Sequence, residues 1–89
     1  MYIITFPSTY QALNFEKKYK ETGLKFTLRP VPREISSSCG IAAQLTTDEI
    51  SIKNLWAECR KYKIETDGLF FLEKQGGKAV VSTILIGQE

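Results

Sequence analysis

Two stretches of the chain have apolar residues at the spacing of an amphipathic helix. The first follows Ser8, and a glutamine three residues later completes the Ser-x-x-Gln pattern of a helix start. It ends near Thr22, ahead of Gly23, a residue type that favours the left-handed cap of a helix. The second begins at Thr46, and its apolar stripe consists of Ile52, Leu55, Trp56, Cys59 and Tyr62. The pattern predicts two helices, each with one buried face.

Five further segments are short and either apolar or alternating, as β-strands are. Residues 24–29 alternate most clearly, and Pro30 would end that strand because proline lacks a backbone donor. Gly76 and Gly77 can form the tight turn of a hairpin between the last two segments. The predicted strands span residues 2–6, 24–29, 40–45, 69–73 and 79–86.

The predicted elements follow one another in the order β-α-β-β-α-β, with one more strand at the end. This order is typical of the ferredoxin-like fold, an α+β two-layer sandwich with both helices on one face of an antiparallel sheet. Residues 79–86 contain no charged side chain. As an exposed sheet edge they would pair readily with another strand, so we expect a homodimer through this C-terminal strand.

The composition is that of a single domain over residues 1–89, because a hydrophobic content of 43% is enough to build one core. The first residues have neither the basic segment nor the long apolar run of a signal peptide or membrane span. The two cysteines lack the spacing of a disulfide-stapled scaffold. We therefore expect reduced thiols, a cytoplasmic location and no membrane association.

Charge and residue usage argue against several kinds of function. The formal net charge is +2 and the two signs are interspersed, so nucleic-acid binding is not expected. The chain has no histidine, which excludes Ser-His-Asp and Cys-His catalysis within it and zinc sites of the histidine-containing kind. No glycine-rich phosphate loop precedes a helix. We expect neither a metal nor a cofactor.

The remaining candidate for chemistry is Cys39, in the segment Pro30-Val31-Pro32-Arg33-Glu34-Ile35-Ser36-Ser37-Ser38-Cys39-Gly40. Small polar neighbours would leave its sulfur accessible, and Arg29 and Arg33 are the cations that could favour a thiolate. The hydroxyls of Ser36, Ser37 and Ser38 and the backbone N–H groups up to Gly40 could hold an anion.

A structural role is the alternative for Cys39, as a half-buried cysteine at a strand start after a flexible serine loop. The second cysteine receives a different interpretation. Cys59 lies on the apolar stripe of the second helix, close to Trp56, and we expect both side chains in the core.

The start Ile4-Thr5-Phe6-Pro7-Ser8-Thr9 and the segment from Arg29 to Gly40 together resemble the selenium/sulfur carrier-like family of small bacterial domains. The resemblance covers about residues 1–73, and the hairpin over about residues 69–86 extends that core. It implies that Cys39 is the carrier residue. The motif around it would be Pro32, Arg33, Ser37, Ser38 and Gly40.

By this resemblance, Cys39 would hold sulfur or selenium as a persulfide or selenosulfide. A cysteine desulfurase-like donor would supply the element and an acceptor protein would receive it. Such a carrier needs no general base and has no turnover of its own. Two other functions stay open: a small-molecule-binding regulatory module of ferredoxin-like fold, and a thiol redox sensor oxidised at Cys39.

Overall fold

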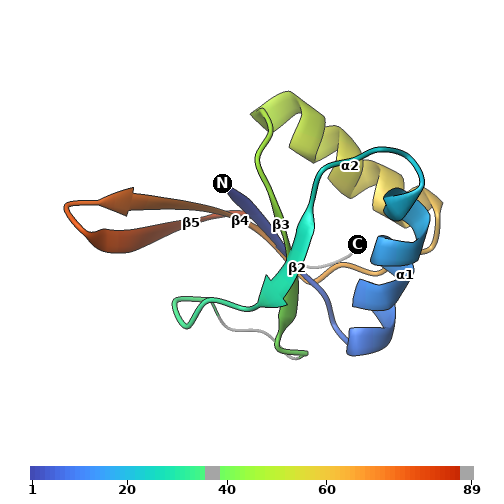
Figure 1. Ribbon diagram of the computed structural model, residues 1–89, viewed down its shortest axis with the longest axis horizontal. Helices are drawn as coiled ribbons and strands as arrows, with labels where there is room; N and C mark the ends of the chain where they lie inside the picture. The colour runs from blue at the N-terminus through green and yellow to red at the C-terminus, as the bar shows by residue number, and fades with distance from the viewer. Residues whose placement is uncertain (36–38, 87–89) are drawn as a thin grey trace.

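The computed structural model describes residues 1–35 and 39–86 (Figure 1). Three residues of the predicted site, Ser36, Ser37 and Ser38, lie outside the described residues. In chain order, the elements are β1 (Tyr2–Thr5), α1 (Thr9–Lys20), β2 (Thr27–Pro30), β3 (Ile41–Leu45), α2 (Glu49–Lys61), β4 (Gly68–Gln75) and β5 (Lys78–Ile86).

The five strands form one sheet in the order β2-β3-β1-β4-β5, and every neighbouring pair is antiparallel. Figure 1 shows both helices on the same side of this sheet, while the β4–β5 hairpin extends beyond the part that the helices cover. The predicted α+β class, with two helices and an antiparallel sheet, is confirmed.

A cluster of buried residues fills the space between the helices and the sheet, and we call it the helix-side cluster. Aromatic contacts join its parts: the Phe15 ring lies 5.4 Å from the Phe6 ring and 5.1 Å from the Phe26 ring, between centroids. Burial of this apolar surface holds the two layers together. Its buried members are Tyr2, Ile4, Phe6, Ala12, Phe15, Tyr19, Ala43, Leu45, Ile52, Leu55, Cys59, Ile64 and Leu69.

The opposite face of the sheet carries a second, smaller cluster, the open-face cluster, of Ile3, Ile35, Ala42 and Phe70. Three of these residues come from strands, whereas Ile35 comes from the segment after β2. Ile35 is buried, and its backbone N–H donates to the Pro32 carbonyl at 2.9 Å. The segment before Cys39 is therefore anchored to the sheet through an apolar side chain.

The strand predicted over residues 24–29 is shorter and shifted: β2 spans Thr27–Pro30. Leu24 and Phe26 lie before it and pack against the helix-side cluster. Their alternation with polar residues therefore reflects one-sided burial rather than strand pairing. Pro30 is the last residue of β2 rather than a residue beyond it, and β2 is an edge strand, where a missing N–H is tolerated.

The start of α1 is confirmed, because Ser8 is its N-cap and the Ser8 side chain accepts from the Gln11 N–H. The predicted start of α2 at Thr46 is wrong, since Asp48 is the N-cap there. The Asp48 carboxylate accepts both the backbone N–H of Ser51 (3.1 Å) and its hydroxyl (2.7 Å). An aspartate that forms two such bonds competes successfully with a threonine two residues earlier.

The apolar stripe of α2 is narrower than predicted. Ile52, Leu55 and Cys59 are buried, but Trp56 is only partly buried and Tyr62 is 43% exposed. Tyr62 is the C-cap of α2, so its side chain lies past the last turn that packs on the sheet. In the described part of the chain, no helix has the length and apolar character needed to cross a membrane.

The tight hairpin predicted at Gly76 and Gly77 is confirmed. Both glycines have positive φ, +58° and +83°, and Gln75 pairs with Lys78 on either side of them. Positive φ at both turn positions suits glycine and matches the twist of the two strands. The strands it joins, β4 and β5, are each longer than predicted.

Candidate functional site

Cys39 lies two residues before the first paired residue of β3, at the end of the sheet where β1 also ends. The pairing of Thr5 with Ala42 and with Gly68 places the start of β3, the end of β1 and the start of β4 together. Because α1 follows β1 and α2 precedes β4, the beginning of α1 and the end of α2 lie at this end too. We call it the Cys39 end of the molecule.

The Cys39 side chain is partly buried and packs against the helix-side cluster. Its sulfur makes two hydrogen bonds to the backbone of Ile41: the thiol donates to the carbonyl oxygen at 3.1 Å, and the N–H donates to the sulfur at 3.4 Å. The second bond would persist on a thiolate or a persulfide anion, whereas the first requires the thiol proton. The sulfur is therefore held at the start of β3 by two backbone groups of one residue, a carbonyl that accepts its proton and an N–H that donates to it.

Gly40 sets the direction in which the chain enters β3. Its φ is +77°, a conformation that favours glycine, and a Cβ there would meet no atom within 4 Å. Its carbonyl accepts the Val31 N–H at 3.0 Å, which joins the two sides of the loop. The glycine is thus required by the backbone conformation rather than by a close approach of other atoms.

The two predicted cations are exposed, and the structure does not place Arg29 on the side of the sheet that Cys39 contacts. Arg29 pairs with Ala42, a member of the open-face cluster, whereas Cys39 packs against the helix-side cluster. Arg33 and Glu34 are exposed in the turn before Ile35. Within the described residues, neither arginine forms a salt bridge, so both side chains are available to a bound partner.

Cys59 is in the core, as predicted. It has no exposed surface, and burial raises the pKa of its thiol to about 12. Its neighbour in the cluster, Tyr19, donates its hydroxyl to the Glu58 carboxylate at 2.8 Å. Burial also raises the pKa of Tyr19, so it stays protonated as that donor. Cys59 is consequently an inert side chain, and Cys39 is the accessible thiol of the two.

Sequence reasoning missed the groups that contact the Cys39 sulfur, because they are backbone atoms of Ile41. Residue types do not reveal which backbone groups will form hydrogen bonds. The one local signal was Gly40, because glycine readily adopts the positive φ found there. Among the described residues, no group of three or more cysteine or carboxylate side chains could hold a metal ion. What the arrangement offers is one sulfur positioned by the backbone of Ile41.

The family model described as "Putative Se/S carrier protein-like" matches residues 1–70 of the 89-residue chain. The matched stretch contains Cys39 and its loop and ends within β4, so most of the β4–β5 hairpin follows it. A search of the curated proteins and a search of the solved structures found no match.

Proposed function

Because the chain belongs to the Se/S carrier protein-like family, we propose that it carries sulfur or selenium on Cys39 as a persulfide or selenosulfide. The observation that carries the proposal is the placement of the Cys39 sulfur, partly buried, with the Ile41 N–H directed at it. The other cysteine is buried in the core and is unsuited to exchange with a second protein.

The loading step is a thiol exchange. The Cys39 thiolate attacks the terminal sulfur of a cysteine persulfide on a donor enzyme, and the donor's S–S bond breaks. A new S–S bond forms on Cys39, and the donor cysteine leaves as a thiolate that takes up the proton lost from Cys39. No external oxidant is consumed, because the transferred sulfur keeps its oxidation state. Transfer to an acceptor thiolate repeats the same exchange.

The surroundings of Cys39 suit a carrier that must keep its cargo. Cys59 is buried in the core and has no exposed surface, so a persulfide on Cys39 would meet no second solvent-accessible thiol of the chain. The Ile41 N–H would stabilise its charge. Arg33, exposed in the preceding turn, is available to the donor or acceptor protein.

We also infer that the first six elements form a ferredoxin-like unit. The order β2-β3-β1-β4 supports this classification, since β1 and β3 lie at the centre and β2 and β4 flank them. β5 then adds a fifth strand beside β4.

The test is intact-protein mass spectrometry after incubation of the reduced protein with a cysteine desulfurase and cysteine. We expect wild type and Cys59→Ala to gain the mass of one sulfur atom and Cys39→Ser to gain none. An adduct that survives in Cys39→Ser would contradict the proposal. So would the absence of any adduct on a protein whose Cys39 reacts with iodoacetamide, and ligand binding would then be the better interpretation.

A further inference from the structure

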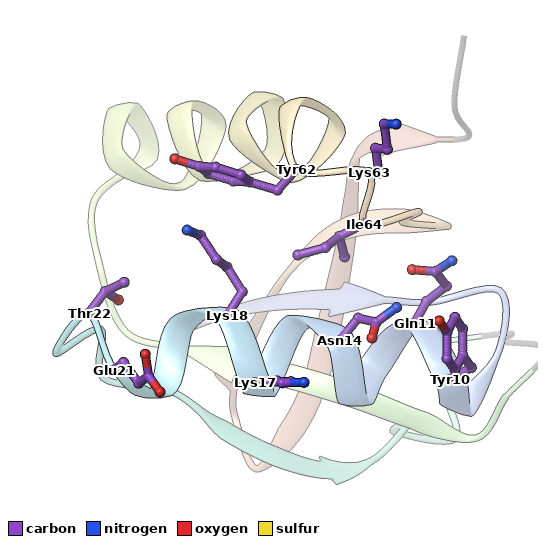
Figure 2. A pocket seen from close by; sticks show the side chains of 10 residues that line it. All are labelled: Tyr10, Gln11, Asn14, Lys17, Lys18, Glu21, Thr22, Tyr62, Lys63 and Ile64. Atoms are coloured by element: carbon purple, nitrogen blue, oxygen red, sulfur yellow. The ribbon is translucent and has the colours of Figure 1, made fainter.

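A groove of about 810 Å³ runs along the outer surface between α1 and the end of α2, and we call it the helix groove (Figure 2). It lies on the helical layer and includes no residue of the Cys39 loop. Its lining includes Tyr10, Gln11, Lys17, Lys18, Tyr62 and Lys63.

The helix groove is more basic than the rest of the chain, although the Glu65 carboxylate accepts from its Gln11 side chain at 3.3 Å. Of the twelve Lys and Arg residues, three line it; of the ten Asp and Glu residues, one does. The remaining nine of each sign balance, so the net charge of the protein is concentrated in this groove. None of its three lysines forms a salt bridge to a described residue.

Aromatic side chains accompany these charges. Tyr62 is 43% exposed and Tyr10 is 70% exposed. The Lys18 ammonium lies 3.9 Å from the centroid of the Tyr62 ring, which holds the charge over the groove. Exposed tyrosines are typical of protein-binding surfaces, since their side chains contribute contact area at little entropic cost.

The positions of the lysines indicate the shape of the ligand. Figure 2 shows Lys17 and Lys18 on α1, with Lys18 extending toward Tyr62, and Lys63 at the rim after α2, with its ammonium directed away from α1. A compact anion such as phosphate requires donors that converge on one point. Donors spread along a groove suit a chain segment with several carboxylates.

The helix groove also reaches the Cys39 end of the molecule. Tyr10 and Gln11 belong to the first turn of α1, and Lys63 follows α2, so all three lie where the topology places the start of β3. If a segment of another protein bound in the groove, the rest of that protein would lie close to Cys39.

We propose that the helix groove binds an acidic segment of the protein that exchanges sulfur with Cys39. The identity of this partner rests on the proposed function, whereas the binding of a carboxylate-rich segment does not. The lysines would attract the partner electrostatically, and Tyr10 and Tyr62 would contact its backbone. Docking in the groove would then orient the partner's thiol toward the Cys39 end.

The test is a titration of ¹⁵N-labelled protein with N-acetylated hexaglutamate at low ionic strength, followed by amide chemical shifts. We expect shift changes over residues 10–22 and 62–64. The triple variant Lys17→Gln, Lys18→Gln and Lys63→Gln should bind about tenfold more weakly, since each exposed ion pair contributes about 0.5 kcal/mol.

The matched control, Lys25→Gln, Lys74→Gln and Lys78→Gln, removes the same charge from exposed positions outside the groove. It should weaken binding less than about threefold. Equal losses in the two variants, or shift changes located elsewhere, would overturn the proposal. So would saturable binding of inorganic phosphate in the groove as tight as that of the peptide, which would assign the site to a compact anion.

This titration involves no sulfur transfer, so Cys39→Ser should bind hexaglutamate like wild type. If Cys39 accepted sulfur but the groove bound no peptide, the docking proposal would be wrong and the carrier proposal would stand. If the groove bound the peptide but Cys39 accepted no sulfur, the groove would still bind acidic segments, and only the assignment of its partner as a sulfur-exchanging protein would be wrong. The two proposals therefore fail separately.

Discussion

The two cysteines show how tertiary position gives one residue type two different properties. Cys39 is partly buried next to a strand end, with both of its hydrogen bonds made to Ile41. Cys59 is enclosed by the helix-side cluster, and burial raises its pKa to about 12. The apolar stripe of α2 predicted the second of these environments, because residues at helical spacing share one face. The sequence left two environments open for Cys39, an accessible sulfur or a half-buried side chain at a strand start, and packing against distant residues gives it the second.

The first residue-scale prediction concerns alkylation. At neutral pH, iodoacetamide should label Cys39 at least about a hundredfold faster than Cys59, because a buried thiol with a raised pKa reacts only when the fold opens. Peptide mass spectrometry after timed quenching measures both rates.

In denaturant, the two cysteines should react at similar rates, which is the control for intrinsic differences between the sites. Faster labelling of Cys59 than of Cys39 in the folded protein would show that the accessible thiol has been wrongly assigned.

Helix starts show how far local sequence patterns specify an element. The Ser8 cap was predicted correctly from a four-residue pattern, whereas the predicted start at Thr46 lies two residues before the cap of α2 in the structure. Thr46 and Asp48 lie two residues apart before α2, and both are residue types that cap helices. Which of them is the N-cap depends on which side chain reaches a free backbone N–H. In the structure it is Asp48, which accepts twice from Ser51.

The Asp48 cap should make the stability of the protein depend on pH. Hydrogen bonds from the Ser51 side chain and backbone lower the pKa of Asp48. The part of its contribution that depends on the charge should be complete above the pKa of an unfolded aspartate, about 3.9, and should be lost as the pH falls through the lower pKa of the folded state. In urea unfolding, the stability difference between wild type and Asp48→Ala should therefore be larger near neutral pH than in strong acid.

Asp48→Ser is the matched control, because serine keeps the capping acceptor without the charge. It should recover much of the lost stability at neutral pH and show less dependence on pH. If Asp48→Ala were as stable as wild type at neutral pH, the assignment of Asp48 as the cap of α2 would be wrong.

At the scale of the whole molecule, β5 leaves an open edge on the sheet. The strand extends from Lys78 to Ile86 and carries no charge after Lys78. It also lies outside the stretch matched by the family model. Neutral edges of this length pair readily with other strands.

We expect a homodimer in which two copies of β5 pair antiparallel about Ser82. This register places Lys78 opposite Ile86 of the second copy, whereas a parallel pairing would bring the two lysines together. Sedimentation equilibrium should detect the dimer. Ser82→Lys, which sets two like charges at the two-fold axis, should raise the dissociation constant at least about tenfold.

Thr47→Lys adds the same charge at an exposed position before α2 and should leave the dissociation constant unchanged. A wild-type protein that stays monomeric at its highest soluble concentration would contradict the prediction. Equal dissociation constants for wild type and Ser82→Lys would place the interface elsewhere.

Features that depend on residues a few positions apart could be predicted from local sequence patterns. These were the cap of α1, the burial of Cys59, the glycine turn before Lys78 and the family to which the cysteine loop belongs. The strand order, the separation of Arg29 from the face that Cys39 contacts, and the helix groove required the three-dimensional structure. Those features join segments far apart in the chain, and they form because burying the helix-side cluster fixes how the layers pack.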